Sequence, residues 1–151
     1  MHATTSARAA LAAALLVTAA TACGKKDAPP ADTVSVAPSA ATPARVSDIQ
    51  LGKRVGADKR IVEPTTTFGT RDTIYVSVTT EGAAMNARLT ATWLYNGTQG
   101  VEESDEVISS SGGTHVSEFH ISKATPWPAG SYKVDVQLNG VSAGAREFRV
   151  Q

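Results

Sequence analysis

Apolar and polar residues alternate over much of the sequence after Val46. The segment 72–80, DTIYVSVTT, places its aliphatic residues on one side, and the segment 131–138, SYKVDVQL, repeats the pattern. This period of two is typical of a β-strand with one buried and one solvated face. The same pattern, weaker in places, predicts further strands at 46–51, 60–62, 87–95, 101–109, 114–122 and 146–150. No segment in this region has a convincing helical period.

Turn signals separate the expected strands. Asn96-Gly97 and Asn139-Gly140 are dipeptides typical of β-hairpin turns, and Ser110–Gly113 is expected to be a loop. Seven to eight short strands with one apolar face each predict an all-β fold, in which two antiparallel sheets stack as a β-sandwich. The predicted core includes the large apolar residues of these strands: Trp93, Phe119, Tyr132, Val134 and Phe148.

The segment 130–134, GSYKV, resembles the G-x-Y-x-C segment that opens strand F of immunoglobulin domains. Val134 stands where that family has its second cysteine, and Trp93 resembles the buried tryptophan of the family's core. The resemblance implies an immunoglobulin-like sandwich in which Tyr132 is the corner tyrosine, with its hydroxyl bonded to upstream backbone. The absence of the disulfide leaves side-chain packing to hold the sheets together.

A different pattern precedes the domain. Arg8 is followed by the short apolar run Ala9–Val17 and by small residues that lead into Cys23, the only cysteine of the chain. A charged start, an apolar run and small residues are the parts of an export signal, and this run is too short to span a bilayer. An ordinary secretory signal with a chance cysteine is one interpretation of the segment.

The small-residue run ending in Cys23-Gly24 also resembles the lipobox of bacterial lipoprotein signals, although Ala20 stands where that family usually has Leu. The resemblance implies a signal peptide at 1–22 and acyl chains on Cys23. Because no second cysteine exists, Cys23 has no internal disulfide partner. We therefore expect a membrane-anchored lipoprotein of the bacterial cell envelope. By the same resemblance, Gly24 favours the outer membrane, facing the periplasm or the cell surface.

Residues 23–45 read as the lipid-anchor cysteine followed by a linker rich in proline and alanine. Segment 24–45 has four prolines and no aromatic residue, so it cannot bury enough apolar surface to fold. We expect it to be a disordered spacer, with Lys25 and Lys26 close enough to touch anionic headgroups. The sandwich domain is then expected to cover residues 46–151. The phrase TPWPAGSYKVDVQLNG followed by EFRV also looks like the C-terminal half of bacterial lipoproteins with immunoglobulin-like domains.

Charge and titratable residues narrow the chemistry. From Val46 onward the chain has 10 basic and 12 acidic residues, a net of −2, so no basic face for a nucleic-acid partner is expected.

An acidic run could bind calcium or could protect a sheet edge, and the missing calcium-loop pattern favours the edge. Its members are Glu102, Glu103, Asp105 and Glu106. His115 and His120 are five residues apart, so on one strand they face opposite ways. Neither a metal site nor a cofactor is expected.

Function is the least determined property. The sequence contains no nucleophile elbow, no Walker loop and no dinucleotide fingerprint, so we expect a non-catalytic domain that binds a protein or an envelope component. The alternative is a carbohydrate or small-ligand module with an aromatic platform near Trp127 or Tyr75, which requires an exposed, coplanar aromatic pair. Trp127 lies between two prolines, and an end plug of the sandwich is its favoured interpretation. A hydrolase using Glu and His residues ranks last.

Overall fold

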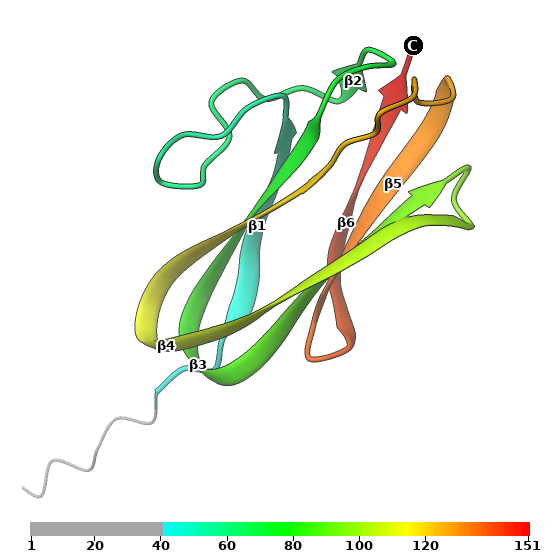
Figure 1. The fold of residues 1–151 in the computed structure, drawn as a ribbon. Helices are drawn as coiled ribbons and strands as arrows, with labels where there is room; N and C mark the ends of the chain where they lie inside the picture. The colour runs from blue at the N-terminus through cyan, green and yellow to red at the C-terminus, as the bar shows by residue number, and fades with distance from the viewer. Residues whose placement is uncertain (1–40) are drawn as a thin grey trace, which may run out of the picture. The chain divides into compact units, whose positions relative to one another are not determined.

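Six strands make up the part of the chain that the computed structural model describes, residues 41–151 (Figure 1). They are β1 (Arg45–Gly52), β2 (Thr67–Phe68), β3 (Ile74–Tyr95), β4 (Gln99–Ile121), β5 (Gly130–Leu138) and β6 (Val141–Val150). None of these residues forms a helix long and apolar enough to cross a membrane. The expected signal peptide at 1–22, Cys23 and most of the linker lie outside the described residues.

The two longest strands, β3 and β4, bend back on themselves (Figure 1). The first half of β3 pairs with β1 and its second half pairs with β5, while β4 follows β3 through both halves. Strands β5, β6 and β2 complete the second half, with β2 parallel to β6. One continuous hydrogen-bonded sheet therefore curls into two facing halves, and the fold is the all-β sandwich that the alternation predicted.

The sequence predicted that the chain leaves the sheet at the positions where β3 and β4 in fact bend. The strands predicted at 72–80 and 87–95 are one strand, β3, and the predicted loop Ser110–Gly113 lies inside β4. Gly82 and Asn86 have positive φ angles of 104° and 53°. Because such residues turn the backbone while neighbouring pairs stay bonded, the ladder continues through an irregular register. Six strands then supply eight straight segments, close to the number predicted.

Two boundaries also differ from the prediction. The end of the expected linker is paired, since the Ala83 amide donates to the Thr42 carbonyl at 2.8 Å and the Ala44 amide donates to the Ala83 carbonyl at 2.9 Å. The short strand expected at 60–62 is only a bridge between Val55 and Ile61, inside the connection from β1 to β2. Residues 42–44, which were assigned to the linker, therefore belong to the hydrogen-bonded structure.

Both predicted hairpin turns are present. Asn96 and Gly97 have φ angles of 50° and 81°, and Asn139 and Gly140 have φ angles of 54° and 78°. Positive φ at both central positions is the geometry of the turn that joins twisted strands. The second turn is also held by β3, because the Asn139 side-chain carbonyl accepts a hydrogen bond from the Arg88 amide at 2.9 Å.

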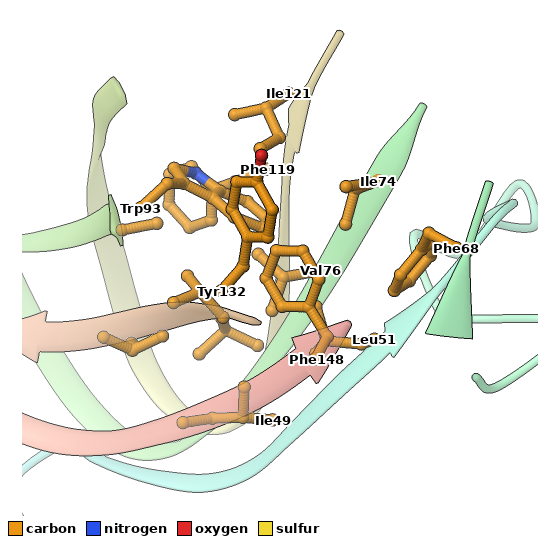
Figure 2. Close-up of a cluster of buried hydrophobic side chains, with 14 of the residues drawn as sticks. Ile49, Leu51, Phe68, Ile74, Val76, Trp93, Phe119, Ile121, Tyr132 and Phe148 are labelled. Carbon is orange, nitrogen blue, oxygen red and sulfur yellow. The ribbon is translucent and has the colours of Figure 1, made fainter. Parts of the chain in front are cut away.

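The inward-facing residues of the two halves form one apolar core (Figure 2). Trp93 and Val134 are fully buried, and Phe119, Tyr132 and Phe148 are nearly so. Phe148 stacks on Tyr132 with ring centroids 5.3 Å apart and meets Trp93 edge-on at 6.0 Å. Val134, which stands where the immunoglobulin family has its second cysteine, is buried in this same core, so side-chain packing joins the two halves.

Tyr132 makes the contact that the family resemblance implied. Its hydroxyl donates to the carbonyl of Pro128, four residues upstream, at 2.9 Å. Burial raises the pKa of the Tyr132 hydroxyl, and the neighbouring Tyr95 adds to the rise. The hydroxyl therefore stays protonated and able to donate at neutral pH, which fixes the corner where β5 begins.

Candidate functional site

The loop end of the domain carries a hollow of about 340 Å³. We use "loop end" for the end formed by the β3–β4 turn, the β4–β5 connection and the segment that leads from β1 to β3. The residues that line the hollow come from β3, the start of β4, the β4–β5 connection and β5: Tyr95, Gln99, Gly100, Val101, Glu102, Ser122, Lys123, Trp127, Pro128 and Tyr132.

Trp127 is fixed at the base of this hollow. Its backbone amide donates to the Thr70 carbonyl at 2.7 Å, and its indole Nε1 donates to the Asp72 carbonyl at 3.0 Å. Only 5% of the residue is exposed, and the Lys123 ammonium lies 5.9 Å from the ring centroid. The side chain therefore plugs the end of the sandwich and presents only a small part of its surface to the hollow.

Asp72 strengthens the same corner. Its carboxylate accepts hydrogen bonds from Lys53 at 2.7 Å and from the Gly69 amide at 2.8 Å. The bond from Lys53, followed by that from Gly69, lowers the pKa of the Asp72 carboxyl below its ordinary value. The connection that receives Trp127 is thus held by a charged side chain as well as by backbone bonds.

Tyr95 forms the accessible aromatic wall. Its ring is 4.8 Å from that of Tyr132 at an angle of 49°, and its hydroxyl donates to the Ala129 carbonyl at 3.2 Å. A Cβ atom at Gly130 would lie 2.7 Å from the Tyr95 ring. Glycine at position 130 therefore allows the ring to lie flat against the corner, where it stays half-buried.

The rim of the hollow is polar and has charges of both signs. Gln99, Glu102, Ser122 and Lys123 are all exposed. An aromatic wall inside a mixed polar rim can bury an apolar group while hydrogen bonds and charges around it fix its orientation. Sequence reasoning found Trp127 but missed Tyr95 and this rim, because these residues meet only through the pairing of segments distant in the chain.

Tyr75, the second predicted contact residue, lies elsewhere. It is half-buried, alternates with the inward-facing Ile74 and Val76, and does not line the hollow. Its ring packs against His120 across the strand pair, with centroids 5.2 Å apart and planes at 37°. Trp127 and Tyr75 are therefore not brought together, and neither position offers the exposed, coplanar aromatic pair that sugar stacking requires.

The two histidines face opposite ways, as their spacing predicted. His115 is paired with Thr80 and has a buried Nε2 without a partner, whereas His120 is exposed and its Nδ1 lies 2.8 Å from Glu118. Within residues 41–151, no three His, Cys, Asp or Glu side chains are grouped to hold a metal ion.

The acidic run follows the first half of β4. Across 41–151 this strand pairs only with β3, so its other side is a free sheet edge. Glu103 accepts a bond from Thr92 at 3.1 Å, and Asp105 pairs with Arg88 at 3.0 Å. This spread along one edge, rather than convergence on a point, agrees with a charged edge strand that resists pairing with other chains.

No protein-family model matches the chain, and no curated protein matches it. Among solved structures, an immunoglobulin-like protein from Pseudomonas aeruginosa is 15% identical, with a TM-score of 0.50 over 72% of this chain and 96% of that one. An alkylpurine DNA glycosylase from Pseudomonas fluorescens, bound to DNA, is 16% identical with a TM-score of 0.49.

The glycosylase match covers 72% of this chain and 30% of the glycosylase. A β-glucosidase from Listeria innocua, in complex with glucose, is 9% identical with a TM-score of 0.44, over 71% of this chain and 15% of the enzyme. The chain thus spans less than a third of either enzyme. The likeness to the Pseudomonas aeruginosa protein, at 15% identity, concerns the fold alone, and this fold is immunoglobulin-like.

Proposed function

We propose that the chain is a lipid-anchored protein of the bacterial cell envelope whose immunoglobulin-like domain is a non-catalytic binding module. Its ligand would be a protein or another envelope component. The hollow at the loop end supports this proposal most directly, because it combines the aromatic wall of Tyr95 with the polar rim of Glu102 and Lys123. Tyrosine and tryptophan in packed pockets are typical anchors of protein interfaces.

The orientation of the rings favours a side chain of a partner protein over a sugar. Tyr132 and Trp127 meet edge to face, with planes at 80°, and both are buried. A sugar ring needs an open aromatic face, whereas an apolar side chain can enter between Tyr95 and the rim. Loops held by a rigid β scaffold are also a common position for binding surfaces.

The place where the chain joins the domain also fits a tethered module. Thr42–Ala44 pair with Ala83 at the bend of β3, and in Figure 1 this bend lies at the opposite end of the domain from the β4–β5 connection. A tether that enters there leaves the hollow free to meet a partner. The lipid itself rests on the lipobox resemblance around Cys23.

The lipid part of the proposal predicts the effect of Cys23→Ala. Cells grown with an alkyne analogue of palmitate should label the wild-type protein and place it in the membrane fraction. The Cys23→Ala variant should lose the label and accumulate as uncleaved or soluble protein. Unchanged labelling, cleavage and membrane retention would refute the anchor.

The binding part is tested by photo-crosslinking in intact envelopes. A photoreactive phenylalanine at Ser122, on the rim of the hollow, should give a discrete adduct with one partner. The matched control is the same group at Gln50, which is exposed on β1. Identical adduct patterns from both positions, or none from Ser122, would argue against a binding role for the hollow.

A further inference from the structure

The end of the domain opposite the hollow contains no charged residue in any of its turning segments. We use "bend end" for these segments, which are 41–44, 82–87, 108–114 and 139–143. Their sequences are ATPA, GAAMNA, ISSSGGT and NGVSA, although 19% of the chain is charged. The segments belong together in space: Ala44 bonds to Ala83, and Asn139 bonds to Arg88 just after the bend. Figure 1 shows the bends of β3 and β4 and the β5–β6 turn at one end.

Large apolar side chains project from this same end. Met85 is 91% exposed, Val141 is 70% exposed and Val107, next to the bend of β4, is 56% exposed. The other large apolar residue exposed to this degree within 41–151 is Val62, in the connection from β1 to β2. Single exposed apolar residues are common on protein surfaces, but here three of four lie at or next to one end, and two of them, Met85 and Val141, lie in its uncharged segments.

We propose that the bend end rests on the bilayer surface, with Met85 and Val141 entering the headgroup region. The proposal rests on the lipid anchor of the proposed function. Apolar side chains gain by leaving water for the boundary between headgroups and acyl chains. Charged groups at the same depth would lose hydration. The turning segments of this end have none, and Arg45 and Glu81, which border them, form an ion pair without net charge. The serine, threonine, asparagine and glycine residues can hydrogen-bond to headgroups and interfacial water.

The position of the tether selects the bilayer as the occupant of this surface. Residue 41 belongs to the bend end, and 17 residues separate it from Cys23. At about 3.1 Å per residue, an extended spacer of this length reaches roughly 55 Å at most. An anchored chain therefore enters the domain at this end and not at the loop end. A stable dimer would instead need about 800 Å² per partner and aromatic anchors, and the bend end contains no aromatic residue.

The test uses the full lipidated protein, reconstituted into vesicles of phosphatidylethanolamine and phosphatidylglycerol. Acylation occupies Cys23, so Met85→Cys introduces the only free thiol, to which an environment-sensitive fluorophore can be attached. Thr125→Cys, exposed at the loop end, is the matched control. The label at position 85 should show a blue shift and a several-fold rise in emission, and nitroxide-bearing lipids should quench it. The label at position 125 should keep its emission in water.

Three outcomes separate the inference from the anchor on which it depends. If the protein floats with the vesicles but the label at position 85 stays in water, the inference is wrong and the anchor stands. If the label shifts but resists quenching by nitroxide lipids, and the shift grows with protein density, a second protein copy covers this end and the inference is also wrong. If mass spectrometry finds no acyl chain on Cys23, the proposed anchor fails and the inference fails with it.

Discussion

The loop end and the bend end are built from the same two strands but differ in every property that decides what they can contact. At the loop end, β3 turns sharply into β4 through Asn96-Gly97, and a buried tryptophan closes the sandwich beside a charged rim. At the bend end, both strands turn gradually through glycine and asparagine, Met85 projects, and the turning segments are uncharged and bordered by the exposed ion pair Arg45–Glu81. We propose that the loop end recognises a partner and that the bend end contacts the bilayer.

The difference has a physical origin in how each end is held. At the loop end, connections that pair with no neighbouring strand over most of their length must be fixed by side chains, which the Trp127 indole and the Asp72 carboxylate supply. At the bend end, the ladder of β3 and β4 continues through the turn and satisfies much of the backbone. Ala84, Ala87 and Ile108 form a small buried cluster there, whereas Met85 and Val141 project into solvent.

The largest expected difference in stability is between the loss of the Trp127 side chain at the loop end and the loss of the Met85 side chain at the bend end. Trp127→Ala leaves a cavity and removes the bond to the Asp72 carbonyl, so it should lower the free energy of unfolding by about 3–5 kcal/mol. Met85→Ala should change it by less than about 0.5 kcal/mol. Urea denaturation followed by circular dichroism measures both. Equal losses at the two positions would break the comparison.

A smaller difference in stability is expected between alanine substitutions in the bend of β3 and in the β3–β4 turn. Gly82→Ala forces alanine to a φ of 104° and places its Cβ 2.6 Å from the Pro43 carbonyl oxygen. We expect a loss of about 2–3 kcal/mol, because backbone strain and overpacking add. Gly97→Ala, at a φ of 81° with nothing within 4 Å, should cost only about 1 kcal/mol. The two midpoints of urea unfolding give the difference directly, and a Gly97→Ala loss as large as that of Gly82→Ala would contradict it.

The smallest effect concerns pH at the loop end. The pKa of Asp72 is lowered in the folded state, chiefly by Lys53, so its contribution is present above the unfolded pKa of about 3.9 and is lost as the pH falls through the folded value. The Asp72 and Lys53 side chains are 30% and 46% exposed, so solvent screening limits the contribution to less than about 1 kcal/mol.

Asp72→Asn measures this contribution. The stability difference between wild type and the variant should be present at neutral pH and shrink toward zero in strong acid. Lys53→Met removes the main cause of the lowered pKa and should weaken the pH dependence of the wild-type domain. A difference that grew on acidification would have the wrong sign.

Local alternation predicted the buried positions well, because a period of two depends only on neighbouring residues. It placed Trp93, Val134 and Phe148 in the core, where the structure has them. The prediction missed the continuity of β3 and β4, since it separated the strands at 72–80 and 87–95 and took Ser110–Gly113 for a loop. Glycine in a strand can mark either a break or a bend, and only the cross-strand partners distinguish the two.

The candidate site was predictable only in part, for the same reason. Trp127 stood out as a large aromatic residue between prolines, and its interpretation as an end plug agrees with its buried position. Tyr95 and Lys123 gave no local signal, because they meet Trp127 through topology rather than through spacing. The four uncharged segments of the bend end lie apart in the sequence, and only the fold shows that they meet at one end of the domain.

The most direct measurement compares photo-crosslinks from the two ends in the same intact envelope. A photoreactive phenylalanine at Ser122 reports on the loop end, and one at Ser142 reports on the β5–β6 turn of the bend end. We predict a discrete protein adduct from Ser122 and phospholipid adducts, without that protein, from Ser142. Protein adducts from Ser142 together with none from Ser122 would contradict it.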